Sequence, residues 1–120
     1  PAVVELSRIG DLSSGVRLSV STPGKHVGWS VAGIGDINGD GVCDVAVGGN
    51  VSGSSSGLLY VVYGKGGGFE SSVSLSDLDG SNGFQVSGIA GDGAFMTVKG
   101  AGDVNNDNKS DIVIGVPYAE

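Results

Sequence analysis

The sequence has a single cysteine and a single histidine in 120 residues. The lone cysteine, Cys43, excludes an intramolecular disulfide. One histidine without a nucleophile fixed beside it in the sequence gives no support for a Ser–His–Asp hydrolase. These shortages favour a chain that does not catalyse a reaction.

Basic residues and long apolar runs are also scarce. Six Lys and Arg against thirteen Asp and Glu give a net charge of −7, which argues against nucleic acid as a partner, because phosphate backbones need basic patches. We find no apolar run long enough to predict a membrane span. Glycine, by contrast, makes up 24 residues and clusters at turns, which is typical of a chain of tight hairpins.

Most informative are two nine-residue runs of the form D-x-N-x-D-x-x-x-D, which begin at Asp36 and at Asp103. Ca²⁺ is a hard cation that binds about six to eight oxygens from carboxylates, amides and backbone carbonyls. We therefore predict two calcium sites, each using the side chains at positions 1, 3, 5 and 9 and the carbonyl at position 7. The predicted ligands are Asp36, Asn38, Asp40, Val42 and Asp44 in the first loop, and Asp103, Asn105, Asp107, Lys109 and Asp111 in the second.

These loops differ from an EF-hand, whose position 12 is a bidentate Glu. Position 12 is Val47 in one copy and Ile114 in the other, and the short β-branched flanks predict strands. Position 6 must turn sharply, which suits Gly41 and is tolerated by Asn108. The alternative is a pair of Asx-rich turns without an ion, although clustered carboxylates repel one another unless a cation neutralises them.

The two loops belong to a longer repeat, because residues 33–48 match residues 100–115 at an offset of 67. We predict four short strands in the complete repeat, at about 28–35, 44–48, 57–63 and 83–88. A period of this size indicates a repeat architecture, and four antiparallel strands describe a β-propeller blade. The predicted domains are 1–71, with the fourth strand of a preceding blade and strands one to three, and 72–120, with strand four and strands one and two.

At this point the sequence resembles a family. Residues 27–41 and 111–117 are similar to FG-GAP repeats, the blades of integrin α-subunit propellers and of many secreted bacterial proteins, and residues 58–65 and 78–84 resemble the bacterial form. The resemblance implies an all-β fold of about two four-stranded antiparallel blades, the second incomplete, with calcium loops joining the first two strands of each blade. One departure is the Phe-Gly pair, which is Val27-Gly28 in the first copy.

The same resemblance implies partners. Known propellers have at least four blades, so we expect either a segment of a longer propeller chain or a protomer completed by other copies of itself. Ligands of integrin-like propellers bind loops on the face opposite the metal, which here correspond to residues 49–57 and 88–94. An extracellular protein or glycan is the expected ligand class.

The leading hypothesis is a non-enzymatic, calcium-binding propeller module of a secreted or cell-surface protein, used in adhesion, recognition or extracellular scaffolding. One alternative is the protomer of an extracellular filament or ring assembled by pairing of exposed blade edges. A second is an accessory propeller segment of a larger secreted hydrolase. Asn50 begins an N-glycosylation sequon and is a candidate glycosylation site.

Overall fold

The computed structural model describes residues 15–51, 57–69, 72–88 and 97–116. Within these ranges the chain is built from strands and one short 3-10 helix, and no α-helix occurs. The strands are β1 (Arg17–Ser19), β2 (Lys25–Gly35), β3 (Asp44–Val51), β4 (Gly57–Val62), β5 (Ser72–Ser74), β6 (Gly83–Ser87), β7 (Thr97–Gly102) and β8 (Asp111–Gly115). The 3-10 helix, η2 (Leu75–Asp77), lies between β5 and β6.

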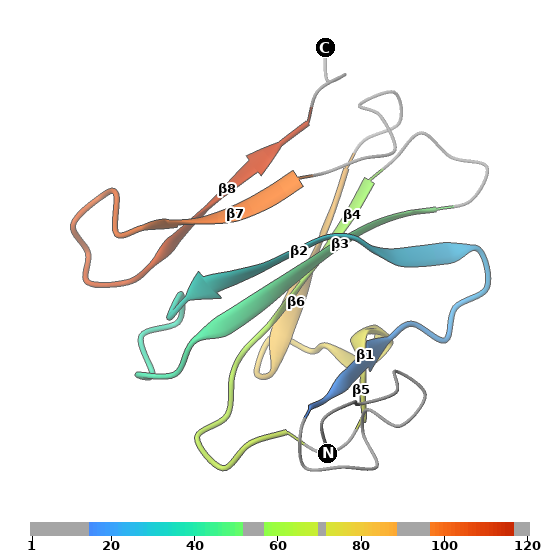
Figure 1. The fold of residues 1–120 in the computed structure, drawn as a ribbon, viewed down its shortest axis with the longest axis horizontal. Helices are drawn as coiled ribbons and strands as arrows, with labels where there is room; N and C mark the ends of the chain where they lie inside the picture. Colours follow the sequence, from blue (N-terminus) through green and yellow to red (C-terminus); the bar gives the residue numbers. More distant parts are fainter. Residues whose placement is uncertain (1–14, 52–56, 70–71, 89–96, 117–120) are drawn as a thin grey trace, which may run out of the picture.

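The centre of the molecule is a four-stranded sheet with the strand order β2-β3-β4-β6, in which every pair is antiparallel (Figure 1). This confirms the predicted all-β class with antiparallel strands. The four predicted strands are all present, although β2 and β3 are longer than expected. Their extra residues pair with each other, because Lys25 lies opposite Val51 beyond a register shift between Val27 and Ser30.

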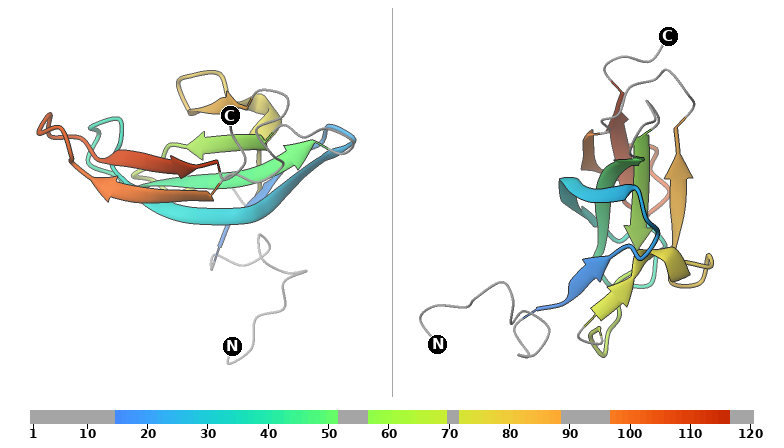
Figure 2. Two further views of the ribbon diagram at one scale, coloured as in Figure 1. Left: turned by 90° about the horizontal axis from the view of Figure 1, so that it is seen from above. Right: turned by 90° about the vertical axis from the view of Figure 1, so that its right-hand side faces the viewer.

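Two smaller sheets complete the fold. β7 and β8 form an antiparallel hairpin that lies alongside the four-stranded sheet (Figure 2). β1 pairs with β5 in parallel, with Leu18 opposite Val73. The first predicted domain, 1–71, was expected to begin with the fourth strand of a preceding blade; β1 is the first described strand of that range, and whether it belongs to a preceding blade remains a prediction.

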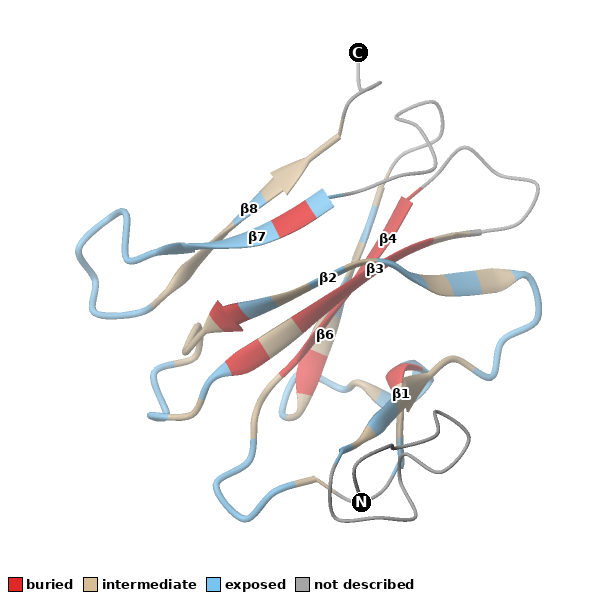
Figure 3. Ribbon diagram, in the orientation of Figure 1, coloured by how far each residue is buried: buried red, intermediate tan, exposed pale blue. Residues whose placement is uncertain are grey.

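All six residues of the central strand β4 are buried (Figure 3). The strand is therefore covered on both faces of the sheet, and the core has two layers. Side chains alternate between the faces of a strand. On one side, here called the β7 face, the buried cluster is Ile34, Ala46, Leu59, Val61 and Val98. On the other side, here called the β1 face, it is Val47, Leu58, Tyr60, Val62 and Leu75.

This arrangement fixes the places of the loops. Burying a Val or Leu side chain contributes about 1.5–3 kcal/mol to the stability of the folded chain. The buried residues of the central strands therefore stabilise the β2–β3 and β7–β8 hairpins that pack on them. The β2–β3 and β7–β8 connections emerge at the same end of the molecule (Figures 1 and 2). The loops expected to bind a ligand, at 49–57 and 88–94, lie largely outside the described residues.

Candidate metal centre

Each acidic run forms the connection of a hairpin, the first between β2 and β3 and the second between β7 and β8. Both hairpins have the same irregularity just before the loop. The register shifts between Gly33 and Gly35 in the first, and between Gly100 and Gly102 in the second. A bulge of this kind bends a strand and increases its twist. The strands that lead into the two loops, β2 and β7, are therefore bent at equivalent positions.

The same backbone-to-side-chain hydrogen bonds recur in both loops, 67 residues apart. The amide of position 5 donates to the side chains of positions 1 and 3, at 3.0 and 3.3 Å in each loop. Position 6 donates to the other oxygen of position 1, at 2.7 Å from Gly41 to Asp36 and 2.9 Å from Asn108 to Asp103. Position 7 donates to position 5 at 2.9 Å in both loops. The loop is therefore a repeated structure rather than a coincidence of composition.

The last aspartate ties each loop to its own beginning. Asp44 Oδ2 accepts a hydrogen bond from the amide of Ile37, and Asp111 Oδ2 accepts one from the amide of Val104, both at 2.8 Å. Asp44 is only 1% exposed and its Oδ1 also accepts from the amide of Gly64 at 2.8 Å. A buried carboxylate needs such donors, and Asp44 has one on each oxygen.

Two positions of each loop adopt left-handed backbone conformations. Position 6 has φ of +85° at Gly41 and +66° at Asn108, as its turn requires. Position 4 does the same, with φ of +80° at Gly39 and +63° at Asn106. Sequence reasoning did not identify position 4, although its signal is present, because both copies place Gly or Asn there.

The carboxylates of the second loop come together. Among the described residues, Asp103, Asp107 and Asp111 each offer a carboxylate oxygen within 4.8 Å of the other two, and no equivalent trio forms in the first loop. In the first loop both oxygens of Asp44 already accept amide hydrogen bonds, and Asp40 Oδ2 accepts one from Asn38 Nδ2 at 3.2 Å. More of the carboxylate oxygens in the first loop therefore accept hydrogen bonds from donors of the chain itself.

Asp36 is held in its ionised form by the loop backbone. The amide of Gly41, followed by those of Gly39, Asp40 and Asn38, lowers the pKa of this carboxyl below its ordinary value, although partial desolvation opposes the shift. Hydrogen bonds to the charged form of a carboxyl favour that form. A carboxylate kept ionised is ready to bind a cation.

The two loops touch. The amide of Ser110 donates a hydrogen bond of 2.8 Å to the carbonyl of Asp36, and the side chain of Ser110 packs against Gly35. The stem of Lys109 lies over Gly39, where an added Cβ would come within 3.3 Å of Lys109 Cε. The two predicted sites are therefore in direct contact through Ser110 and Lys109 of the second loop.

The donors fit a hard cation. The gathered groups are carboxylates, with the amide oxygens of Asn38 and Asn105 in the same loops, and oxygen is the ligand type that Ca²⁺ prefers. The thiol of Cys43 is exposed and is not part of the gathered group. For Val42 and Lys109 the structure shows the amides engaged with position 5, and the ligand role of their carbonyls remains a prediction.

The remaining predicted site lies elsewhere. Asn50 is half-buried within β3, opposite His26 on β2 and Gly57 on β4. Its use as a glycosylation site remains a prediction.

Together the fold and the loops define an all-β chain with an internal repeat whose hairpins end in acidic loops. Residues 100–120 match the family model of the FG-GAP repeat, a range that covers the second half of β7, the second loop and β8. The resemblance stated from the sequence is thereby confirmed for this segment. Neither a curated protein nor a solved structure gives a significant match to the chain. In the described part of the chain, no helix has the length and apolar character needed to cross a membrane.

Proposed function

We propose that this chain is a non-enzymatic, calcium-binding β-propeller module of a secreted or cell-surface protein, which serves in adhesion, recognition or extracellular scaffolding. The observation that carries the proposal is the pair of loops with one hydrogen-bond pattern, of which the second gathers Asp103, Asp107 and Asp111. The FG-GAP match over 100–120 and the sequential antiparallel sheet support the propeller interpretation.

In this proposal the chain's own residues prepare the site. The loop amides orient Asp36 and Asp103 by holding both of their oxygens. Asp44 and Asp111 close each loop onto its second residue. The bound ion would supply two positive charges, which offset the mutual repulsion of the carboxylates. The ion would stabilise the folded chain, because a site absent from the unfolded state links binding to folding.

The FG-GAP match supports the extracellular part of the proposal. Extracellular calcium modules bind at roughly 10⁻⁴–10⁻³ M, a concentration found outside cells. Sites of that strength would be filled only there. The acids of the loops are engaged in backbone hydrogen bonds, which suits ligands better than a general acid and base, and this supports a non-enzymatic role.

Thermal unfolding with calcium, with chelator and with calcium restored tests the proposal. We expect calcium to raise the midpoint reversibly, and we expect Mg²⁺ to do so far less, because it demands a smaller octahedral site. Asp103→Asn should reduce the calcium effect. Asp79→Asn is the matched control, since Asp79 accepts hydrogen bonds from Ser81 in a surface turn outside both loops. A midpoint that ignores calcium would rule the proposal out.

A further inference from the structure

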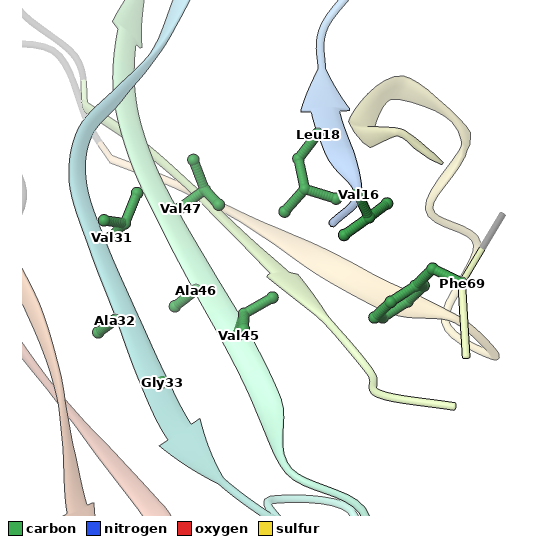
Figure 4. Close-up of a pocket in the computed structure, with 9 residues that line it drawn as sticks. All are labelled: Val16, Leu18, Val31, Ala32, Gly33, Val45, Ala46, Val47 and Phe69. Carbon is green, nitrogen blue, oxygen red and sulfur yellow. The ribbon is translucent and has the colours of Figure 1, made fainter. Parts of the chain in front are cut away.

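An apolar groove of about 370 Å³ opens between the β2–β3 hairpin and β1 (Figure 4). Val31, Val45 and Val47 lie along the hairpin side of this groove, and Leu18 and Phe69 face them from across it. Val31 is 68% exposed. A β-branched side chain this exposed, beside a continuous apolar surface, indicates a place where something packs.

The chain itself shows what packs on this kind of surface. Val98 is the counterpart of Val31 at the repeat offset of 67, and Ile112 and Ile114 are the counterparts of Val45 and Val47. Val98 is only 3% exposed, because it packs with Ile34 and Ala46 on the β7 face. Ile112 and Ile114 pack against the same cluster. In the second hairpin, therefore, this face is buried against the preceding sheet.

The surface on which the second hairpin packs, formed by Ile34 and Ala46, also has a counterpart in the second repeat. The counterparts of Ile34 and Ala46 are Ala101 and Val113. Ala101 is exposed and Val113 is 54% exposed. Lys99 lies opposite Val113, and its aliphatic stem can cover apolar surface while its ammonium stays in water. The described chain thus has one buried copy of the interface. Of the unburied halves, Ala101 and Val113 are exposed on one, and Val31 is exposed and Val45 half-buried on the other, whereas Val47 is already buried in the core.

We propose that a second copy of this chain docks head to tail, with the Ala101–Val113 surface of one copy seated in the groove of the next, against Val31 and Val45. This face-to-face packing differs from pairing at strand edges. It is a heterologous contact, so it repeats until it closes a ring or grows into a filament. None of the predicted calcium ligands lies in it, so this proposal is separate from the proposed calcium binding.

Sedimentation velocity of the purified chain in millimolar calcium, over a range of protein concentrations, tests this contact. We expect species larger than one chain that increase with concentration. Val31→Asp and Val113→Asp each damage one half of the contact, and each variant alone should sediment as a monomer. Gln85→Glu, an exposed site on β6, adds the same charge away from both surfaces and should behave as the wild type.

Mixing the two variants gives the sharper result. The Val31→Asp chain keeps its Ala101–Val113 surface, and the Val113→Asp chain keeps its groove, so the mixture should form a dimer and stop there. That outcome also shows that both variants are folded. A wild-type chain that stays monomeric throughout would overturn the proposal. So would normal association of Val113→Asp, which would mean that the groove pairs with itself. Calcium-dependent melting of the same samples reports separately on the loops.

Discussion

The two hairpins have the same loop hydrogen bonds but differ in how the loop is supported. The first loop joins two strands of a four-stranded sheet, and its closing residue Asp44 is buried and held by Gly64 from beyond β4. The second loop joins a two-stranded hairpin, and its closing residue Asp111 is only half-buried. It is in the second loop that three carboxylates gather.

The difference separates two sources of loop stability. In the first loop, amides of the loop itself and the amide of Gly64 beyond β4 donate to the carboxylates and offset much of the negative charge, so the loop is stabilised largely by the chain itself. In the second loop, the carboxylates lie near one another with fewer such donors, and their repulsion leaves more for a cation to offset. We infer that the first loop contributes mainly to folding and that the second responds more strongly to calcium.

The largest effect on stability and calcium binding should come from replacing the closing aspartates, Asp44 and Asp111, with asparagine. Asp44→Asn places an NH₂ group where a carboxylate oxygen now accepts an amide hydrogen bond, so a buried donor loses its partner at a cost of about 1–3 kcal/mol. We expect this loss in calcium-free buffer. Asp111→Asn should cost less there, because its site is more open, yet it should weaken calcium binding more.

Chemical denaturation with chelator and calorimetric titration with calcium measure the two effects. The comparison fails if both variants lose equal stability without calcium and equal affinity with it. Asp77→Asn, at an exposed position of η2, removes a charge outside the loops and serves as the control for net charge.

An intermediate effect is expected at position 6 of the loops. Gly41→Ala and Asn108→Ala both put alanine in a left-handed conformation, which costs about 1–2 kcal/mol for an L-residue. Because Asn tolerates this region better than alanine but less well than glycine, we expect Asn108→Ala to cost less than Gly41→Ala. Asn108→Gly should be close to neutral. Equilibrium unfolding of the three variants decides the order, and the reverse order would show that backbone strain does not shape these turns.

The smallest effect is expected in the stability of the folded chain at acidic pH. Hydrogen bonds lower the pKa of Asp36 in the folded chain below its ordinary 3.8, so the unfolded chain binds this proton more tightly. The resulting stability is complete above the unfolded pKa and is lost as the pH falls through the lower folded value. In chelator, unfolding measured down to about pH 3 should therefore show a shallower acid decline for Asp36→Asn than for the wild type. Equal slopes would show that this carboxylate is not selectively held.

Much of this arrangement could be predicted from the sequence. The repeat offset, the four sheet strands and the position of both loops between strands follow from β-branched runs, glycines and spaced aspartates, which are local signals. The need for left-handed geometry at Gly41 and Asn108 was equally local. The same rule applied to Gly39 and Asn106 would have found position 4 as well.

Other features could not be read from the chain because they depend on residues far apart. The hydrogen bond from Gly64 to Asp44 joins residues twenty apart, and nothing in the spacing of either indicates it. The contact of Ser110 with Asp36 depends on how one hairpin packs beside the other. The parallel pairing of β1 with β5 is likewise a tertiary result, since it joins Leu18 to Val73, far apart in the sequence.

The most direct test of the central claim is equilibrium dialysis of the purified chain against calcium, counting ions bound per chain. The account predicts two ions per wild-type chain at millimolar calcium, and one for the Asp103→Asn/Asp111→Asn double variant. No bound calcium at these concentrations would contradict it and would leave the two loops as Asx-rich turns.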